Sequence, residues 1–451
     1  MSLTANKALR VFGILILATS MTGCSMLKNI GGGGKNKEKF SPDKERIAIL
    51  TGENNLEVDA TLANTPVVLP NAYRNKSWTQ TGGNASKAIY HLEIGDKLTQ
   101  VWRRNIGNGN GNYQRLAAGP VAAGGVVYAM DIDADVTAVD LATGRILWTK
   151  DLDNKKEKSK VGFGGGVAYW NGSVYATTGY GYIVSLDAKS GSENWRYDGS
   201  IPLRNAPTVT DGRLFAVTQD NRILAFDANT GTEIWDQVGI TETATMYGAA
   251  SPAIDGETIV VALSSGELMA LRTQNGRLLW QDSLSRTNRL TPLATLADID
   301  ASPVIDRGRV YAVSHAGRMV SIDMRSGQRA WEGNVASVNT PLIAGDYGFV
   351  VTVDAEIACI ALTDGRIRWT SQIQKFEDQK KRRGLISWTA PVLAGDRLFI
   401  ASSHGYLLSI SPYTGEVLSG KKLSGGVTTP PIVVDGTLVL LNEDGDLIAF
   451  R

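Results

Sequence analysis

Short apolar segments alternate with polar turns along most of the chain, with the spacing of β-strands. Residues 301–331 show the unit: apolar strands are expected at 302–305, 310–313 and 319–322, and a fourth begins at Gln328. Turns rich in Asp and Gly separate these segments, as in chains of β-hairpins. Beyond the N-terminal segment no apolar run keeps helical periodicity over ten or more positions. The pattern therefore predicts an all-β protein.

The unit repeats roughly every 45 residues, and a glycine followed four positions later by tryptophan marks each repeat. The pairs are Gly144/Trp148, Gly191/Trp195, Gly231/Trp235, Gly276/Trp280, Gly327/Trp331 and Gly365/Trp369. A seventh repeat has Gly415, with Ser419 in the tryptophan position. Four strands and one large aromatic anchor per repeat are typical of β-propeller blades. We interpret the aspartates four positions before several of these glycines as turn residues, namely Asp140, Asp187, Asp227 and Asp323.

The repeat region ends one strand short of an eighth blade. After Ser419 three more strands are expected, at 431–434, 438–441 and 447–450. The missing strand precedes the first repeat, where residues 99–103 include Trp102 in the tryptophan role. We therefore predict an eight-bladed β-propeller of four-stranded blades over residues 98–451, closed by this N-terminal strand. Closure leaves only short strand edges exposed.

The N-terminus has the features of a bacterial lipoprotein signal. Lys7 and Arg10 precede an apolar run at 11–20, about half as long as a bilayer-spanning helix. Met21-Thr22-Gly23-Cys24 follows and resembles a lipobox. We expect a signal peptide over 1–23 and lipidation at Cys24, which would anchor the mature chain firmly to a membrane. The alternative is an ordinary secretory signal followed by an incidental cysteine.

The segment after Cys24 separates the anchor from the repeats. Residues 24–45 contain a glycine run and several lysines, a composition that predicts a flexible tether. Residues 46–97 mix short apolar pieces with Asn, Thr and Pro, and we expect an extended arm lying partly on the propeller. Because Ser25 follows the lipidated cysteine, we predict a location at the periplasmic face of the outer membrane, held by the lipid anchor.

The charged residues nearly cancel, with 46 Lys and Arg against 45 Asp and Glu. Such a balance gives no overall field that would attract nucleic acid. Two basic clusters, at 155–160 and 375–383, fall in loops between blades. Their charge is either simply solvated or contacts an acidic protein or lipid phosphate.

Catalytic and metal-binding motifs are missing from the sequence. The three histidines, at 91, 315 and 404, lie far apart, and Cys359 sits in an apolar run that predicts a buried, inert thiol. The glycine-rich stretch 162–166 precedes an expected strand rather than a helix, which argues against a phosphate loop. We therefore expect no enzyme activity, no cofactor and no metal.

The glycine-tryptophan repeat resembles that of the quinoprotein propellers, some of which are pyrroloquinoline-quinone dehydrogenases. Those enzymes typically place an adjacent cysteine pair at the cofactor, and this sequence has no such pair. With its lipobox and tether, the chain resembles more closely the BamB family, lipoproteins of the machinery that assembles β-barrels in the bacterial outer membrane. Residues 102–116 are similar to the family's first loop, and residues 296–303 to its L-x-D-x-D-x-x-P segment.

This resemblance implies a non-catalytic scaffold that binds the periplasmic POTRA domains of BamA and assists the folding and insertion of outer-membrane β-barrels. Members use two adjacent loops that lead into mid-ring blades. In one loop Asp298 and Asp300 match directly, with local turn capping as the alternative. In the other loop Met246 stands for the second leucine of a Leu-x-Leu-Arg-Gly pattern, and Tyr247 stands where its arginine is expected.

Other functions remain open at this level. One is a lipid-anchored propeller with a different envelope partner, and another is a quinoprotein dehydrogenase. A further hypothesis is that exposed blade edges hold strands of nascent outer-membrane proteins by β-augmentation.

Overall fold

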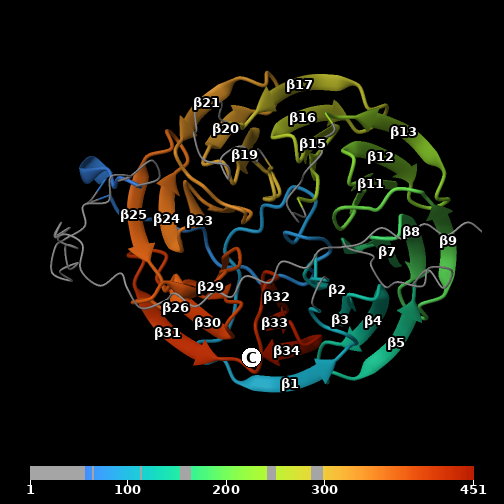
Figure 1. The fold of residues 1–451 in the computed structure, drawn as a ribbon, viewed down its shortest axis with the longest axis horizontal. Helices are drawn as coiled ribbons and strands as arrows, with labels where there is room; N and C mark the ends of the chain where they lie inside the picture. The colour runs from blue at the N-terminus through green and yellow to red at the C-terminus, as the bar shows by residue number, and fades with distance from the viewer. Residues whose placement is uncertain (1–55, 63–64, 112–113, 153–163, 241–249, 286–297) are drawn as a thin grey trace, which may run out of the picture. The chain divides into compact units, whose positions relative to one another are not determined.

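Eight antiparallel four-stranded sheets follow one another along the chain and stand around a common axis (Figure 1). The computed structural model describes residues 56–62, 65–111, 114–152, 164–240, 250–285 and 298–451. Strands within a sheet pair in chain order, with the first strand nearest the axis and the fourth at the rim. The prediction of an eight-bladed β-propeller is confirmed.

In the first four sheets the strands follow one another from the axis outwards. They consist of β2 (Val121–Ala123), β3 (Val126–Met130), β4 (Asp135–Asp140) and β5 (Ile146–Asp151); β6 (Gly165–Trp170), β7 (Ser173–Thr178), β8 (Tyr182–Asp187) and β9 (Glu193–Asp198); β10 (Thr208–Thr210), β11 (Arg213–Val217), β12 (Arg222–Asp227) and β13 (Glu233–Val238); and β14 (Ala253–Asp255), β15 (Thr258–Ala262), β16 (Glu267–Arg272) and β17 (Leu278–Ser283).

The next three sheets have the same order. They consist of β18 (Val304–Asp306), β19 (Arg309–Val313), β20 (Met319–Asp323) and β21 (Arg329–Gly333); β22 (Leu342–Ala344), β23 (Tyr347–Val351), β24 (Glu356–Ala361) and β25 (Ile367–Gln372); and β28 (Val392–Ala394), β29 (Arg397–Ala401), β30 (Tyr406–Ile410) and β31 (Val417–Lys422). Between the last two sheets, β26 (Phe376–Asp378) and β27 (Arg383–Leu385) form a hairpin that carries part of the basic cluster at 375–383.

The eighth sheet joins the two ends of the repeat region, as predicted. Its first three strands are β32 (Ile432–Val434), β33 (Thr437–Leu441) and β34 (Asp446–Phe450), and its rim strand is β1 (Gln100–Asn105). β1 pairs antiparallel with β34, and Trp102 lies opposite Ala449. The ring is therefore closed by hydrogen bonds between the beginning and the end of the propeller.

Each repeated tryptophan connects its blade to the next one. Trp148, on the rim strand β5, donates its indole N–H to the carbonyl of Ala188 at 3.1 Å and covers Gly191 in the following blade. A Cβ added at Gly191 would lie 2.7 Å from the Trp148 ring, and its φ of +71° also favours glycine. The same indole-to-carbonyl bond is made by Trp102, Trp195, Trp235, Trp280, Trp331 and Trp369. The glycine and the tryptophan thus form one joint between blades.

Ring closure explains why Ser419 replaces the eighth tryptophan. A tryptophan on β31 would have to cover the turn between the third and fourth strands of the eighth blade. That turn does not exist, because β34 ends near the C-terminus and the rim strand β1 comes from the other end of the chain. Its indole would therefore lack both the turn glycine and the turn carbonyl.

The second half of the arm runs through the centre of the ring (blue, Figure 1). Trp78 exchanges two backbone hydrogen bonds of 2.7 Å with Ala122 on β2. The Gln80 side chain bonds both backbone groups of Val209 on β10. Further backbone or side-chain bonds from the arm reach β6, β14, β18, β28 and β32. The arm therefore supplies partners to the innermost strands, whose inner edges would otherwise face the channel unpaired.

Before it reaches the channel, the arm passes along the end of the ring where first and second strands are joined. Val58 forms a parallel bridge with Ile367, the first residue of β25. The short 3-10 helix η1 (Ala60–Leu62) follows, and the carbonyl of Pro66 accepts a bond from the Tyr347 hydroxyl. The loops that lead into the first strands lie at the opposite ends of those strands.

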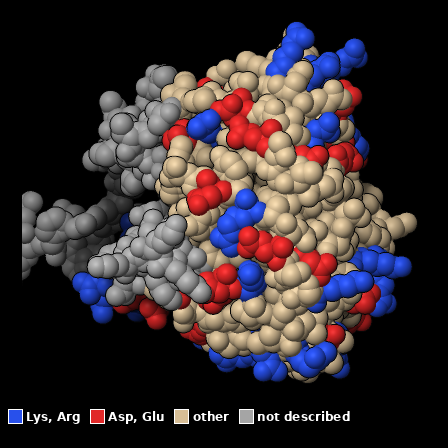
Figure 2. All heavy atoms as spheres, turned by 90° about the vertical axis from the view of Figure 1, so that its right-hand side faces the viewer, with Lys and Arg blue, Asp and Glu red and all other residues tan. Residues whose placement is uncertain are grey.

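The surface and core match the composition of the chain. On the edge seen in Figure 2, acidic and basic side chains are interspersed and neither forms a large patch. Cys359 is buried in β24 and free of any disulfide, and burial raises the pKa of its thiol. Within the described residues, no helix has the length and apolar character needed to cross a bilayer.

Candidate functional site

A buried cluster of one arginine and two aspartates joins two of the loops that lead into first strands. Arg204 Nη2 lies 2.5 Å from Asp298 Oδ1 and 3.4 Å from Asp300 Oδ1. The three side chains are exposed by only 8%, 2% and 7%. Because breaking a buried ion pair leaves an uncompensated charge, this cluster holds the two loops firmly together.

The loops meet because the starts of neighbouring first strands are bonded to one another. Arg204 lies four residues before β10, and Asn205 donates its amide to the carbonyl of Ala250 in the next loop. Ser251 in that loop donates its backbone N–H to Ser302 Oγ at 2.9 Å, and its hydroxyl bonds the carbonyl of Ala206. These polar contacts fix the distance between the loop before β10 and the loop before β18, which lie two blades apart. At that distance the Arg204 guanidinium reaches both aspartates.

Within the described part of the cluster, one guanidinium faces two carboxyl groups. Burial raises the pKa of Asp300 to about 7, and the neighbouring Asp298 adds to this effect while Arg204 opposes it. The shorter contact of Arg204 is with Asp298. The second carboxyl therefore keeps its proton up to near-neutral pH.

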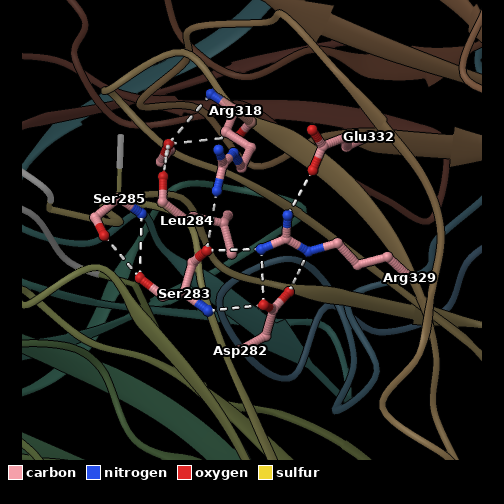
Figure 3. A network of polar contacts seen from close by, with 8 residues as sticks. Asp282, Ser283, Leu284, Ser285, Arg318, Arg329 and Glu332 are labelled. Carbon is pink, nitrogen blue, oxygen red and sulfur yellow. Dashed lines mark hydrogen bonds and ion pairs between the residues drawn. The ribbon is translucent and has the colours of Figure 1, made fainter. Parts of the chain in front are cut away.

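A second network fixes the other end of the segment that leads to Asp298 (Figure 3). Arg329 on β21 makes a bidentate contact with Asp282 on β17, with both N···O distances at 2.7 Å. The same guanidinium bonds the carbonyl of Ser283 at 2.7 Å, and Arg318 approaches that carbonyl at 3.4 Å. The chain is thus anchored where β17 ends and again at Asp298.

The structure brings together only part of the predicted site. Asp298 and Asp300 lie in one cluster, and the partner described for both is an arginine of this same chain. Met246 and Tyr247 fall in 241–249, which lies outside the described residues. Cys24 also lies outside them, in the N-terminal segment 1–55. Their roles remain predictions.

Arg204 is a residue that the sequence reasoning did not single out. The stretch Ile201-Pro202-Leu203-Arg204-Asn205 keeps the leucine and arginine of the Leu-x-Leu-Arg-Gly pattern, and it lies one blade before Met246. Arg204 stands just before Ala206-Pro207, where a strand is expected to begin. Asp300 stands just before Ser302-Pro303 in the same way, and this shared position could have identified Arg204 from the sequence.

Other candidate chemistry is dispersed. The described part of the chain has no group of three or more His, Cys, Asp or Glu side chains placed to hold a metal ion. His91 Nδ1 contacts the carbonyl of Pro70, and His404 Nδ1 contacts the Ser403 hydroxyl. The basic cluster at 155–160 lies outside the described residues.

Comparison with known proteins places this geometry in a family. The sequence profile of the family described as outer membrane protein assembly factor BamB matches residues 96–159, 133–371 and 374–451. The chain is 33% identical over 356 residues to outer membrane protein assembly factor BamB of Salmonella typhimurium, covering 78% of this chain and 88% of that protein. With the protein of the same name from Escherichia coli it shares 32% identity over 352 residues, covering 77% and 87%.

Solved structures show the same fold at lower identity. The crystal structure of BamB from Moraxella catarrhalis superposes with a TM-score of 0.67 at 19% identity, covering 79% of this chain and all of that one. Quinohemoprotein alcohol dehydrogenase from Comamonas testosteroni gives 0.62 at 16% identity, covering 87% and 82%. The structural likeness is shared with enzymes, but the sequence profile and the full-length relatives agree: the chain belongs to the family of outer membrane protein assembly factor BamB.

Proposed function

We propose that this chain is a non-catalytic scaffold of outer-membrane β-barrel assembly, that it binds the periplasmic POTRA domains of BamA, and that a lipid on Cys24 holds it at the periplasmic face of the outer membrane. Family membership supports the assembly role. The likeness to dehydrogenases extends to the fold alone, at 16% identity, and does not favour an enzyme.

One observation carries the choice of surface: a buried ion cluster joins the loops at one end of the ring. Arg204, Asp298 and Asp300 come from loops before β10 and β18, on either side of the loop that contains Met246 and Tyr247. A rigid base of this kind lowers the entropy lost when the loops bind a partner. Exposed edges of such a surface, rather than its buried charges, make the contact.

The four predicted residues have different parts in this proposal. Asp298 and Asp300 act by positioning the loops, because their carboxyl groups are buried against Arg204. Met246 and Tyr247 supply apolar and aromatic contacts, which are common in protein interfaces. The lipid anchor raises the local concentration of the partners, so modest affinity is sufficient.

The test is calorimetric titration of the full chain in detergent with isolated POTRA domains. We expect the double variants Met246→Ala/Tyr247→Ala and Asp298→Asn/Asp300→Asn each to weaken binding by at least about fivefold, roughly 1 kcal/mol. The matched control is Asp255→Asn/Glu257→Gln, in the turn between β14 and β15 at the opposite end of the ring. It should bind as the unmodified chain does.

Two results would contradict the proposal at different levels. Absence of binding by a folded, unmodified chain would overturn the POTRA partner and favour another envelope partner. Binding that both loop variants leave unchanged would keep the partner and overturn the surface. Melting temperatures of all variants separate either result from loss of fold.

A further inference from the structure

A cavity of about 60 Å³ lies inside the ring, between the arm and the starts of four first strands. Its wall includes Pro120, Pro341, Pro391 and Pro430, which stand just before β2, β22, β28 and β32. Proline has no backbone N–H, so these positions offer the cavity apolar rings and no donors. Trp78 and Ile89 of the arm extend the apolar wall.

The arm side of the cavity has a different character, because it is rich in hydrogen-bond donors. Residues 79–83 form a tight turn, in which Thr79 donates to the Gly83 carbonyl at 2.9 Å. The Thr81 hydroxyl, at the tip of this turn, is buried without a partner among the described residues. Buried donors are normally satisfied.

Among the described residues that line the cavity, Lys87 is the only charged one. It is 3% exposed, and its ammonium donates to Thr208 Oγ1 at 3.2 Å. No carboxylate contacts it within the described ranges, and Thr208 is neutral. Burial lowers the pKa of Lys87 to about 7, with no opposing effect from a nearby charge. A buried cation without a counter-ion is costly, and an anion beside it removes most of that cost.

We propose that this cavity binds a short-chain carboxylate ion, with Lys87 supplying the countercharge, Thr81 a hydrogen bond and the proline-lined wall the contact for a small apolar end. The size agrees with such a ligand, because a water needs about 10–15 Å³ on the same scale, so a cavity of about 60 Å³ holds a few waters or one small carboxylate ion. The site is separate from the Arg204 cluster and independent of the function proposed above.

The proposal has a defined pH dependence. The carboxylate pairs with the ammonium form of Lys87, whose pKa without ligand is about 7. At pH values where the ligand is ionised, affinity is therefore highest while Lys87 is protonated and falls as the lysine loses its proton. Between pH 6.0 and 8.5 the apparent dissociation constant should rise about 30-fold, accompanied by proton uptake on binding near pH 7.5.

The experiment titrates the full chain in detergent with sodium propionate by calorimetry at both pH values. Lys87→Met should abolish binding, and Thr81→Val should weaken it several-fold while leaving the pH dependence in place. Lys97→Met, an exposed lysine of the same arm, is the matched control and should bind normally. Propionamide, which has the same shape without the charge, should not bind.

Several outcomes would overturn the proposal. If the unmodified chain does not bind propionate at 20 mM, the cavity holds water beside a neutral Lys87. Binding of propionate by Lys87→Met as strong as by the unmodified chain would also overturn the proposal. So would binding of propionamide as strong as that of propionate. Thr81→Val keeps the test informative if Lys87→Met does not fold, since circular dichroism and melting temperature are measured for each variant.

Discussion

The raised pKa of the buried Asp300 makes stability depend on pH in a direction that a single substitution should remove. Asp300 has its pKa raised from 3.8 to about 7 in the folded chain. Below about pH 3 the carboxyl is protonated in both the folded and the unfolded state, so it does not change the free energy of unfolding. As the pH rises toward 7 the unfolded chain releases the proton while the folded chain retains it, so the free energy of unfolding falls; above 7 the loss is complete.

The size of this effect follows from the pKa difference. A carboxyl that titrates at about 7 instead of 3.8 destabilises the fold by about 4 kcal/mol at high pH. We expect Asp300→Asn, which mimics the neutral acid, to be more stable than the unmodified chain by only about 1 kcal/mol at pH 4.5 and by about 2–4 kcal/mol at pH 8.0.

Urea unfolding followed by tryptophan fluorescence at several pH values measures this difference. Asp255→Asn, at the exposed last residue of β14, is the control and should leave the pH profile unchanged. Parallel profiles for Asp300→Asn and the unmodified chain would refute the reasoning, as would a variant that is less stable at pH 8.0. Either result would mean that Arg204 neutralises both carboxylates in the folded state.

Three further expectations concern the blades. Gly191→Ala should lower the free energy of unfolding by about 2–4 kcal/mol, because the added methyl group meets the Trp148 ring and the residue has a positive φ. Gly172→Ala, also at positive φ but with open space around it, should lower it by about 1 kcal/mol. Urea unfolding midpoints compare the two variants. Trp235→Phe, which loses its indole bond to the next blade, should lower stability by about 1–2 kcal/mol in the same assay. Cys359, buried and with its pKa raised, should react with Ellman's reagent at pH 8 only after urea unfolds the chain, and fast reaction in the native state would contradict its burial.

The eight-bladed ring could be predicted from the sequence because each blade repeats the same strands, turn glycine and tryptophan. Turn glycines with positive φ and tryptophans at a fixed spacing are residue types that few other conformations require, and Trp102 showed which strand closes the ring. Ser419 could be seen as a departure, but its cause depends on ring closure. It became clear only once β34 was seen to lack a following turn.

The arm and the cluster were harder to predict because their contacts are not periodic. Trp78, Gln80 and Lys87 each meet a different blade, so no spacing along the chain reveals their partners. Asp298 and Asp300 were identified from a short motif. Their arginine lies about ninety residues earlier, as the 94-residue separation from Asp298 shows, and only the bonded starts of the first strands bring it near.

The arm changes how the repeats share their stability. In most repeat proteins each unit touches only its neighbours, so blades or helices can be lost one at a time from an end. Here one segment of about twenty residues bonds innermost strands all around the ring, including blades on opposite sides of the axis. The coupling is therefore long-range, and local fraying of one blade is resisted by strands that it does not touch. Unfolding should be all-or-none for the propeller, and it requires the arm to leave the channel.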